Sequence, residues 1–216
     1  MSRGFFITFE GVEGCGKTTQ LHLLKDFLIS RGFEVTATRE PGGTTLGDSI
    51  RKLVLASAAD PIDQKAELML YEASRAQHMY EVIGPALARG DVVLCDRFGD
   101  ATLAYQGYAQ GLPGDYIETL NRFTTGNRNP DFTILIDCPV DLGLERTRDR
   151  AARTGQGISE DRFEKKGLSF HERVRHGYLE IAQRNRDRFL IVDGSGDPAV
   201  IQSILRPAVL ERLKHL

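Results

Sequence analysis

The sequence predicts an α/β fold in a single domain spanning residues 1–216. In this fold a five-stranded parallel sheet lies between two layers of helices, and a short mobile lid is inserted at about residues 148–162. Three observations predict it: five short apolar runs, helical stretches that alternate with them, and a glycine-rich loop between the first run and the first helix. Strands that alternate with helices are typical of open parallel sheets.

The five apolar runs are short, nearly continuous, and rich in β-branched or aromatic residues. This composition is expected for strands that are buried on both faces of a parallel sheet. We therefore predict strands at Phe5–Phe9, Glu34–Thr38, Val92–Cys95, Phe132–Asp137 and Phe189–Asp193.

Helical spacing is clearest between the first two runs, where Leu21, Leu24 and Leu28 recur on one face and Gly32 ends the pattern. The predicted helices are Thr18–Arg31, Ala66–Arg89, Asp141–Ala152 and Pro198–Leu213. The stretch from Arg153 to Glu160 fits neither pattern and contains two glycines. It is interpreted as a mobile insert, because too few residues follow it to build a second core.

Composition excludes several functional classes. The formal net charge is −2, which argues against a broad basic surface for polymeric nucleic acid. Cys15, Cys95 and Cys138 are odd in number and show no metal-ligand spacing, so free thiols in a reducing compartment are expected. No apolar run approaches the ~20 residues of a membrane span, and no signal peptide is recognisable. A soluble, cytoplasmic protein is expected.

The glycine-rich loop at Gly11–Thr18 reads GVEGCGKT and fits the pattern G-x-x-x-x-G-K-[ST] at every fixed position. Since it follows a strand and opens a helix, we predict a P-loop NTPase fold that binds ATP and Mg²⁺. Lys17 is expected to reach the β- and γ-phosphates, and the Thr18 hydroxyl to bind the metal. The predicted nucleotide-binding residues are Gly11, Val12, Glu13, Gly14, Cys15, Gly16, Lys17, Thr18 and Thr19.

A P-loop indicates the phosphoryl donor but does not identify the molecule that accepts the phosphoryl group. A GTPase-type switch would read guanine with an Asn-Lys-x-Asp element, which is absent from this sequence. A non-enzymatic ATP-binding module remains a second alternative, and the acceptor-side features described next argue against it.

Asp96, Arg97 and Phe98 directly follow the third predicted strand. Ligands of open α/β sheets gather at the carboxyl ends of strands, so these residues should face the same crevice as the P-loop. Arg97 could fork onto a phosphate, and Asp96 could support the metal. A structural Asp–Arg ion pair is the alternative interpretation.

Three further segments carry a resemblance to a known family. They are Phe9–Gly14, Arg39–Thr44 (REPGGT), and Asp96–Phe98 followed by Ala104–Gly107 (AYQG). With the P-loop they closely resemble the bacterial thymidylate kinases, in order from residue 5 to about residue 194. The resemblance implies transfer of the γ-phosphoryl of ATP to dTMP, for dTTP synthesis, by a homodimer. Another monophosphate kinase, for UMP/CMP or GMP, or a deoxynucleoside kinase is the runner-up.

The resemblance assigns roles to several residues around the acceptor. Glu13 would bind the acceptor's 3′-hydroxyl, and Arg97 its phosphate, with Arg39 and Arg51 as nearby partners. Glu40 belongs to the same site and precedes a turn proline whose peptide bond is cis in relatives.

Base recognition is implied on the long second helix. Tyr71 and Arg75, four residues apart, share a face and would stack on thymine and bond its exocyclic oxygen. Thr102 and Gln106 would contact the base edge, and Tyr105 would exclude a 2′-hydroxyl. The family usually has Phe at the position of Tyr71, so a more polar pocket floor is a mild departure.

Arginines are concentrated at the end of the third predicted helix and the start of the predicted insert, at positions 146, 148, 150 and 153. Stabilisation of the helix dipole is the simplest explanation for these arginines, but four arginines are more than a helix C-terminus requires. In relatives whose P-loop lacks an arginine, this region supplies the catalytic one. Either Arg148 or Arg153 is predicted for that role, beside Lys17 and Arg97, and Arg146 is expected to pack on adenine.

The five histidines, at positions 22, 78, 171, 176 and 215, are expected on the surface or on helix faces. No Ser-His-Asp or Cys-His pattern competes with the P-loop. In-line transfer without a covalent intermediate is therefore expected.

Overall fold

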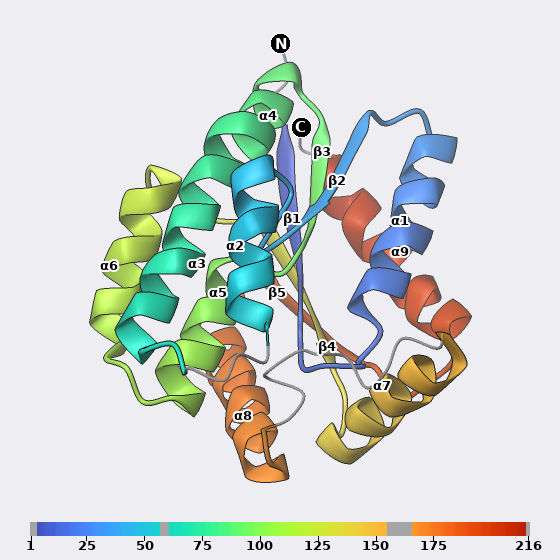
Figure 1. Ribbon diagram of the computed structural model, residues 1–216. Helices are drawn as coiled ribbons and strands as arrows, with labels where there is room; N and C mark the ends of the chain where they lie inside the picture. Colours follow the sequence, from blue (N-terminus) through green and yellow to red (C-terminus); the bar gives the residue numbers. More distant parts are fainter. Residues whose placement is uncertain (1–3, 57–60, 155–165, 215–216) are drawn as a thin grey trace.

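The computed structural model describes residues 4–56, 61–154 and 166–214 (Figure 1). Its sheet has five parallel strands in the order β2-β3-β1-β4-β5. The strands are β1 (Phe5–Glu10), β2 (Val35–Arg39), β3 (Val92–Asp96), β4 (Phe132–Asp137) and β5 (Phe189–Asp193). The predicted α/β fold class is confirmed, and each predicted strand lies within one residue of its observed bounds.

The prediction that every strand is buried on both faces is correct only for the three inner strands. Residues of β1, β3 and β4 are almost all buried, whereas β2 and β5 are half-buried or exposed along much of their length. The latter two are the edge strands of the sheet. The prediction of continuous burial was therefore wrong for β2 and β5.

Helices cover both faces of the sheet. Figure 1 shows α1 and α9 on one side, and α2, α3, α4 and α6 on the other. The helices are α1 (Lys17–Ser30), α2 (Thr45–Leu55), α3 (Gln64–His78), α4 (Gly84–Arg89), α5 (Gly99–Thr102), α6 (Gly114–Thr125), α7 (Val140–Thr154), α8 (Leu168–Arg184) and α9 (Pro198–Leu213), with two π-helical segments, η1 (Met79–Ile83) and η2 (Leu103–Ala109).

Helices α1, α7 and α9 match three predicted helices closely, whereas several other helices were not predicted. The long predicted helix Ala66–Arg89 is observed as α3, η1 and α4 in succession. Arg153 belongs to α7 rather than to an insert. The rest of the predicted insert, and most of the predicted lid, lie outside the described residues. Helices α2, α5, α6 and α8 and segment η2 had no counterpart in the prediction.

Alternating side chains of β1 build the core on both faces of the sheet. Ile7 packs in the larger cluster, which includes Leu24 of α1, and Phe6 packs in a second cluster with Ile83 and Leu87. Across the described ranges, no helix is both long enough and apolar enough to span a membrane.

Three loops meet at the carboxyl edge of the sheet because β1, β2 and β3 are parallel neighbours. Phe9 pairs with Asp96, and the amide of Arg97 donates to the carbonyl of Phe9 at 2.9 Å. The amide of Glu40, after β2, donates to the carbonyl of Asp96, also at 2.9 Å. The Glu40–Pro41 peptide bond is cis. The P-loop and both acceptor-side segments are thereby anchored to one another by backbone.

Candidate active site

The P-loop is packed so closely that two of its glycines cannot be replaced. Gly11 and Gly14 have φ angles of 141° and 68°, in the region that side chains rarely adopt. A Cβ on Gly11 would lie 2.4 Å from the carbonyl oxygen of Ile136, and one on Gly14 would lie 1.9 Å from that of Gly143. The loop is therefore held against the end of β4 and the start of α7.

Lys17 and Thr18 open helix α1 at the end of this loop. The Lys17 ammonium donates to the carbonyls of Gly11 at 3.1 Å and Val12 at 2.8 Å. The Thr18 hydroxyl donates to Asp96 Oδ2 at 2.5 Å, so the two residues predicted at the metal lie together. A hydroxyl and a carboxylate are the hard oxygen donors that Mg²⁺ takes from a protein when phosphates supply the remaining ligands. The donor set fits a magnesium site.

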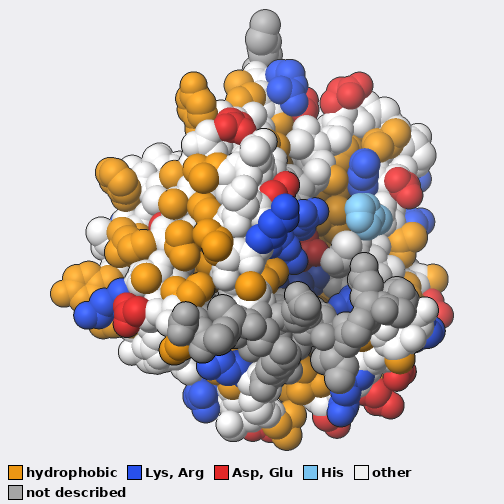
Figure 2. All heavy atoms as spheres, in the orientation of Figure 1, with side chains coloured by type: hydrophobic (Ala, Val, Ile, Leu, Met, Phe, Trp, Pro, Cys, Tyr) orange, Lys and Arg blue, Asp and Glu red, His pale blue; other side chains and the backbone are white. Residues whose placement is uncertain are grey.

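A cavity of about 920 Å³ joins the P-loop to the acceptor side. Figure 2 shows basic side chains gathered at a hollow in this face. Of the predicted site residues, the cavity is lined by Glu13, Gly14, Cys15, Gly16, Lys17, Thr18, Thr19, Arg39, Glu40, Arg51, Tyr71, Arg75, Asp96, Arg97, Thr102, Tyr105, Gln106 and Arg146.

Four predicted residues stand apart from that lining. Gly11 and Val12 are buried in the loop itself. Arg148 and Arg153 are exposed, and each donates from Nε to a carbonyl of its own helix, at 3.3 Å. Arg150 of the same helix lines the cavity instead.

Arg97 is held in a strained backbone conformation. Its φ is 71°, which costs a non-glycine residue on the order of 1–3 kcal/mol and is typical of functional sites. Its guanidinium donates to the carbonyl of Gly11 at 3.0 Å and to the hydroxyl of Tyr178 at 2.9 Å, and it lies 4.9 Å from the centre of the Tyr105 ring. Arg97 is thus clamped between the P-loop and helix α8.

Glu13 is the acidic residue of the P-loop, and both of its carboxylate oxygens are bonded. Oε1 accepts from the Tyr105 hydroxyl at 2.5 Å and from Arg97 at 3.3 Å, and Oε2 lies 3.1 Å from Nδ1 of His171. Burial alone would raise its pKa, but the hydrogen bond with His171 and the charges of Arg97 and Lys17 outweigh burial and lower the pKa to about 2. Glu13 is therefore ionised at physiological pH.

Glu10 behaves in the opposite way, although it is only three residues earlier. It is fully buried at the end of β1 and accepts from the Phe98 amide at 2.7 Å and from the Tyr178 hydroxyl at 2.8 Å. Burial, followed by the nearby charge of Asp100, raises its pKa from 4.5 to about 8. Glu10 accordingly carries a proton at neutral pH.

The raised pKa of Glu10 predicts a pH-dependent stability. The folded state holds the proton between pH 4.5 and about 8 and the unfolded state does not, so stability is lost as pH rises through this range. Wild-type unfolding free energy should fall relative to Glu10→Gln by at most about 1.4 kcal/mol per pH unit. Urea unfolding of both proteins from pH 5 to 8.5 measures this difference. Parallel curves would contradict the assignment.

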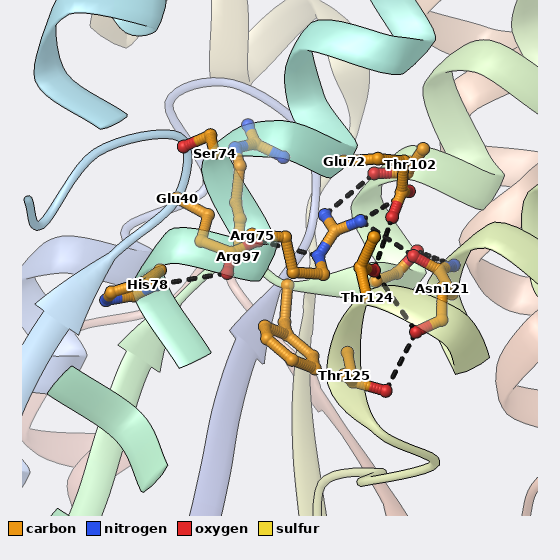
Figure 3. A network of polar contacts seen from close by, with 12 residues as sticks. Glu40, Glu72, Ser74, Arg75, His78, Arg97, Thr102, Asn121, Thr124 and Thr125 are labelled. Atoms are coloured by element: carbon orange, nitrogen blue, oxygen red, sulfur yellow. Dashed lines mark hydrogen bonds and ion pairs between the residues drawn. The ribbon is translucent and has the colours of Figure 1, made fainter. Parts of the chain in front are cut away.

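Arg75 lies at the centre of a buried polar network (Figure 3). It donates from Nε to Glu40 at 2.9 Å, from Nη1 to Glu72 at 2.7 Å and Asn121 at 2.6 Å, and from Nη2 to Thr102 at 2.8 Å. A guanidinium has five N–H groups. Within the described part of the chain, the second Nη2 hydrogen has no acceptor, while Arg75 lines the cavity. One donor therefore remains for a ligand.

Two further hydrogen-bonded side chains, Gln106 and His78, lie beside this network. Gln106 donates to the buried carboxylate of Glu67 at 2.7 Å. His78 bridges Glu40 at 3.0 Å and Thr38 at 2.6 Å. Gln106 and Glu40, which line this end of the cavity, are therefore held by hydrogen bonds with side chains of α3.

Arg146 marks the opposite end of the cavity. Its guanidinium donates to the carbonyls of Gly194 at 2.7 Å and Ser195 at 3.0 Å, in the turn after β5. Arg146 of helix α7 and this turn thus form one wall of the cavity.

Known proteins match this chain over nearly its whole length. A family model described as Thymidylate kinase matches residues 9–204. The chain belongs to the thymidylate kinase family. It is 52% identical to the thymidylate kinase of Geobacter sp. (strain M21), covering 99% of this chain and 94% of that one, and 50% identical to that of Geotalea daltonii, covering 97% and 98%. The solved thymidylate kinase of Ehrlichia chaffeensis has a TM-score of 0.75 and 34% identity, and covers 96% and 99% of the two chains. The family predicted from the motifs is confirmed, and with it the enzyme class, a phosphotransferase.

Sequence reasoning missed several residues of this thymidylate kinase family site. His78 and His171 lie on helices, as expected, but both are fully buried and bonded to carboxylates of the site, which the sequence did not predict. Tyr178 was not singled out, although it bonds Arg97 and Glu10. Its spacing from Phe170 and Val174 is helical, and this signal would have found helix α8.

Proposed function

We propose that this chain phosphorylates dTMP with ATP and Mg²⁺, in the cytoplasm, to give dTDP and ADP. One observation carries the proposal: a single cavity has a P-loop at one end and, at the other, an arginine with one donor left for a base carbonyl. The cysteines, all free and buried, suit a reducing compartment.

On the donor side, the P-loop amides and Lys17 hold the phosphates of ATP, and Arg146 packs on adenine. Thr18 and Asp96 would hold a magnesium ion, which when bound would neutralise phosphate charge. Lys17 leaves the carbonyls of Gly11 and Val12 when phosphates arrive, since a charged acceptor binds it more strongly. Arg148 or Arg153 supplies further positive charge to the transferring group, with Arg150 a third candidate because it lines the cavity.

On the acceptor side, Arg97 forks onto the phosphate of dTMP, with Arg39 and Arg51 nearby. Glu13 accepts from the 3′-hydroxyl, and Tyr105 fills the space of a 2′-hydroxyl. Thymine stacks on Tyr71. Its O4 carbonyl accepts the remaining hydrogen of Arg75, while Thr102 and Gln106 border its edge. The acceptor phosphate is thereby aimed in line at the γ-phosphoryl group.

A coupled assay of ADP formation tests the proposal against its alternatives. The panel contains dTMP, dUMP, dCMP, UMP, GMP and thymidine. The proposal expects dTMP to give the highest kcat/KM. Preference for a ribonucleotide, or for the nucleoside, would replace it with one of the runner-up kinases.

Arg97→Lys should be nearly as damaging as Arg97→Ala, because a point charge cannot replace a fork on a phosphate. The expected result is a KM for dTMP raised by about 10-fold or more, the effect of one lost charge-assisted bond. Steady-state kinetics of both variants measure it. A lysine variant with near-normal KM would make Arg97 a structural ion-pair member instead.

We also propose that the chain forms a homodimer through helices α2, α3 and α6. These helices contact one another, α2 with α3 and α3 with α6. Figure 2 shows hydrophobic side chains gathered on their side of the molecule. The large exposed apolar residues on these helices and on η1 are Leu46, Leu53, Met69, Tyr80, Tyr116 and Phe123. Large apolar side chains exposed together on one side of a molecule favour association with a partner.

Phe123→Glu should convert the dimer into a monomer. Phe123 is 84% exposed, so the substitution leaves the monomer core intact while placing a charge in the interface. Val200→Glu is the matched control, since Val200 is 58% exposed on the opposite helical layer. Sedimentation equilibrium measures both. A wild-type chain that is monomeric at micromolar concentration would contradict the dimer.

A further inference from the structure

Helix α8 carries a buried histidine that the mechanism above does not use. The side chain of His171 is 1% exposed, and its Nδ1 lies 3.1 Å from Oε2 of Glu13. Its other ring nitrogen, Nε2, is buried and has no hydrogen-bond partner among residues 4–56, 61–154 and 166–214. The ring therefore makes one polar contact within these residues, and that contact is with the P-loop.

The direction of this hydrogen bond follows from the state of its acceptor. Glu13 is ionised, as derived above, and an ionised carboxylate only accepts. The hydrogen must lie on Nδ1 of His171, which donates to Oε2. Because Tyr105 and Arg97 both bond the other oxygen, Oε1, the plane of the carboxylate is set from two sides.

A buried nitrogen without a hydrogen-bond partner carries a free-energy cost. If the ring only filled space, a leucine or phenylalanine would fill it without that cost. The bond from Nδ1 to Glu13 is thus the contact that favours histidine at this position.

The rest of α8 fixes the ring in place. Tyr178 is seven residues later on the same helical face, and its hydroxyl bonds both Glu10 and Arg97. Phe170 packs edge-on against Tyr105, with ring centres 6.2 Å apart. At the far side, Arg175 holds Asp137 with two bonds of 2.7 and 2.8 Å. Helix α8 is therefore fixed in position relative to Arg97 and Tyr105, which belong to the proposed acceptor site.

We propose that His171 is a positioning residue for the acceptor: it orients the Glu13 carboxylate so that Oε2 receives the 3′-hydroxyl of dTMP. The inference rests on the proposed function, and it makes selection of a 3′-hydroxylated acceptor a property of helix α8 as well as of the P-loop. Oε2 has a lone pair left beside the one that His171 occupies, because each carboxylate oxygen accepts two bonds.

The test compares dTMP with 3′-deoxythymidine monophosphate as acceptors. In His171→Leu, kcat/KM for dTMP should fall about 10- to 100-fold, mainly through KM, the range for a hydrogen bond to a charged group. The kcat/KM for the 3′-deoxy acceptor should stay within a few-fold of the wild-type value. The preference for dTMP over the 3′-deoxy acceptor is therefore expected to be lost. In His171→Asn an amide N–H replaces Nδ1–H, and the preference should be largely restored. His176→Leu, an exposed histidine on the same helix, is the matched control and should match wild type.

A double variant separates a positioning role from a structural one. If His171 acts through Glu13, then Glu13→Gln with His171→Leu should be no worse than Glu13→Gln alone. Circular dichroism and thermal melts of each variant establish folding, and His171→Gln replaces the leucine variant if that one does not fold.

Equal losses for both acceptors, or an unchanged preference in a folded His171 variant, would overturn the positioning role. A preference that survives Glu13→Gln would instead overturn the assignment of Glu13, and this inference with it. Failure of the wild-type protein to use dTMP at all would appear in the acceptor panel, and would overturn the proposed function itself.

Discussion

Lys17→Ala is expected to lower kcat by about 10³-fold or more while the fold stays intact, because the lysine charge stabilises the transferring phosphoryl group. Its ammonium donates to two P-loop carbonyls and lines the cavity proposed to hold ATP. Stopped-time ADP assays at saturating ATP and dTMP measure the loss.

The control for Lys17 is Lys25→Ala, on the same helix and outside the cavity lining. It should leave kcat near wild type. Thermal melts of both variants exclude unfolding as the cause. Retention of more than a tenth of wild-type activity by Lys17→Ala would remove Lys17 from the catalytic set.

The acceptor order should be dTMP, then dUMP, then dCMP with almost no turnover. Uracil lacks only the methyl group, so kcat/KM for dUMP should be about 10- to 200-fold lower, the range for one lost apolar contact. Cytosine presents an amino donor where thymine presents O4. The cytosine amino group and the remaining N–H of Arg75 are both donors, so no hydrogen bond can form between them. Such a mismatch weakens binding of the transition state by several kcal/mol.

Replacing Arg75 should flatten that order. Arg75→Ala also leaves the buried carboxylates of Glu40 and Glu72 without their cation, at a cost of about 3–5 kcal/mol in stability. Arg75→Lys is therefore the sharper variant, because it keeps the charge but cannot supply five donors in a plane. The measurement is kcat/KM for the three acceptors with wild type and both variants. A folded Arg75→Lys protein that keeps the full order would contradict the role of Arg75.

The strands and the P-loop could be predicted because their signals are local. A glycine-rich loop between an apolar run and a helix determines where Lys17 and Thr18 lie, and parallel strands place Arg97 beside them. Helices α2, α6 and α8 were missed although α8 has a clear helical spacing of Phe170, Val174 and Tyr178. Helix α2 also begins at a capping residue, Thr44, whose hydroxyl accepts from the Gly47 amide at 2.9 Å.

The buried histidines could not be predicted from local pattern. His171 meets Glu13 across 158 positions of sequence, and His78 meets Glu40 across 38. A histidine on a helix has the same local context whether its face meets solvent or a carboxylate. Which one it meets depends on how α8 and α3 dock, and no short window of residues contains that information.

The register of β1 and β3 has a consequence for how such enzymes diverge. The P-loop, proposed to hold ATP, follows β1, and Arg97, proposed to hold the acceptor phosphate, follows β3; the amide of Arg97 donates to the carbonyl of Phe9 on β1. The span between them is set by the ~4.8 Å spacing of adjacent strands, which is independent of side-chain identity. Substitutions in the base pocket, on α3 and η2, can therefore retune the choice of acceptor without disturbing the path along which the phosphoryl group travels.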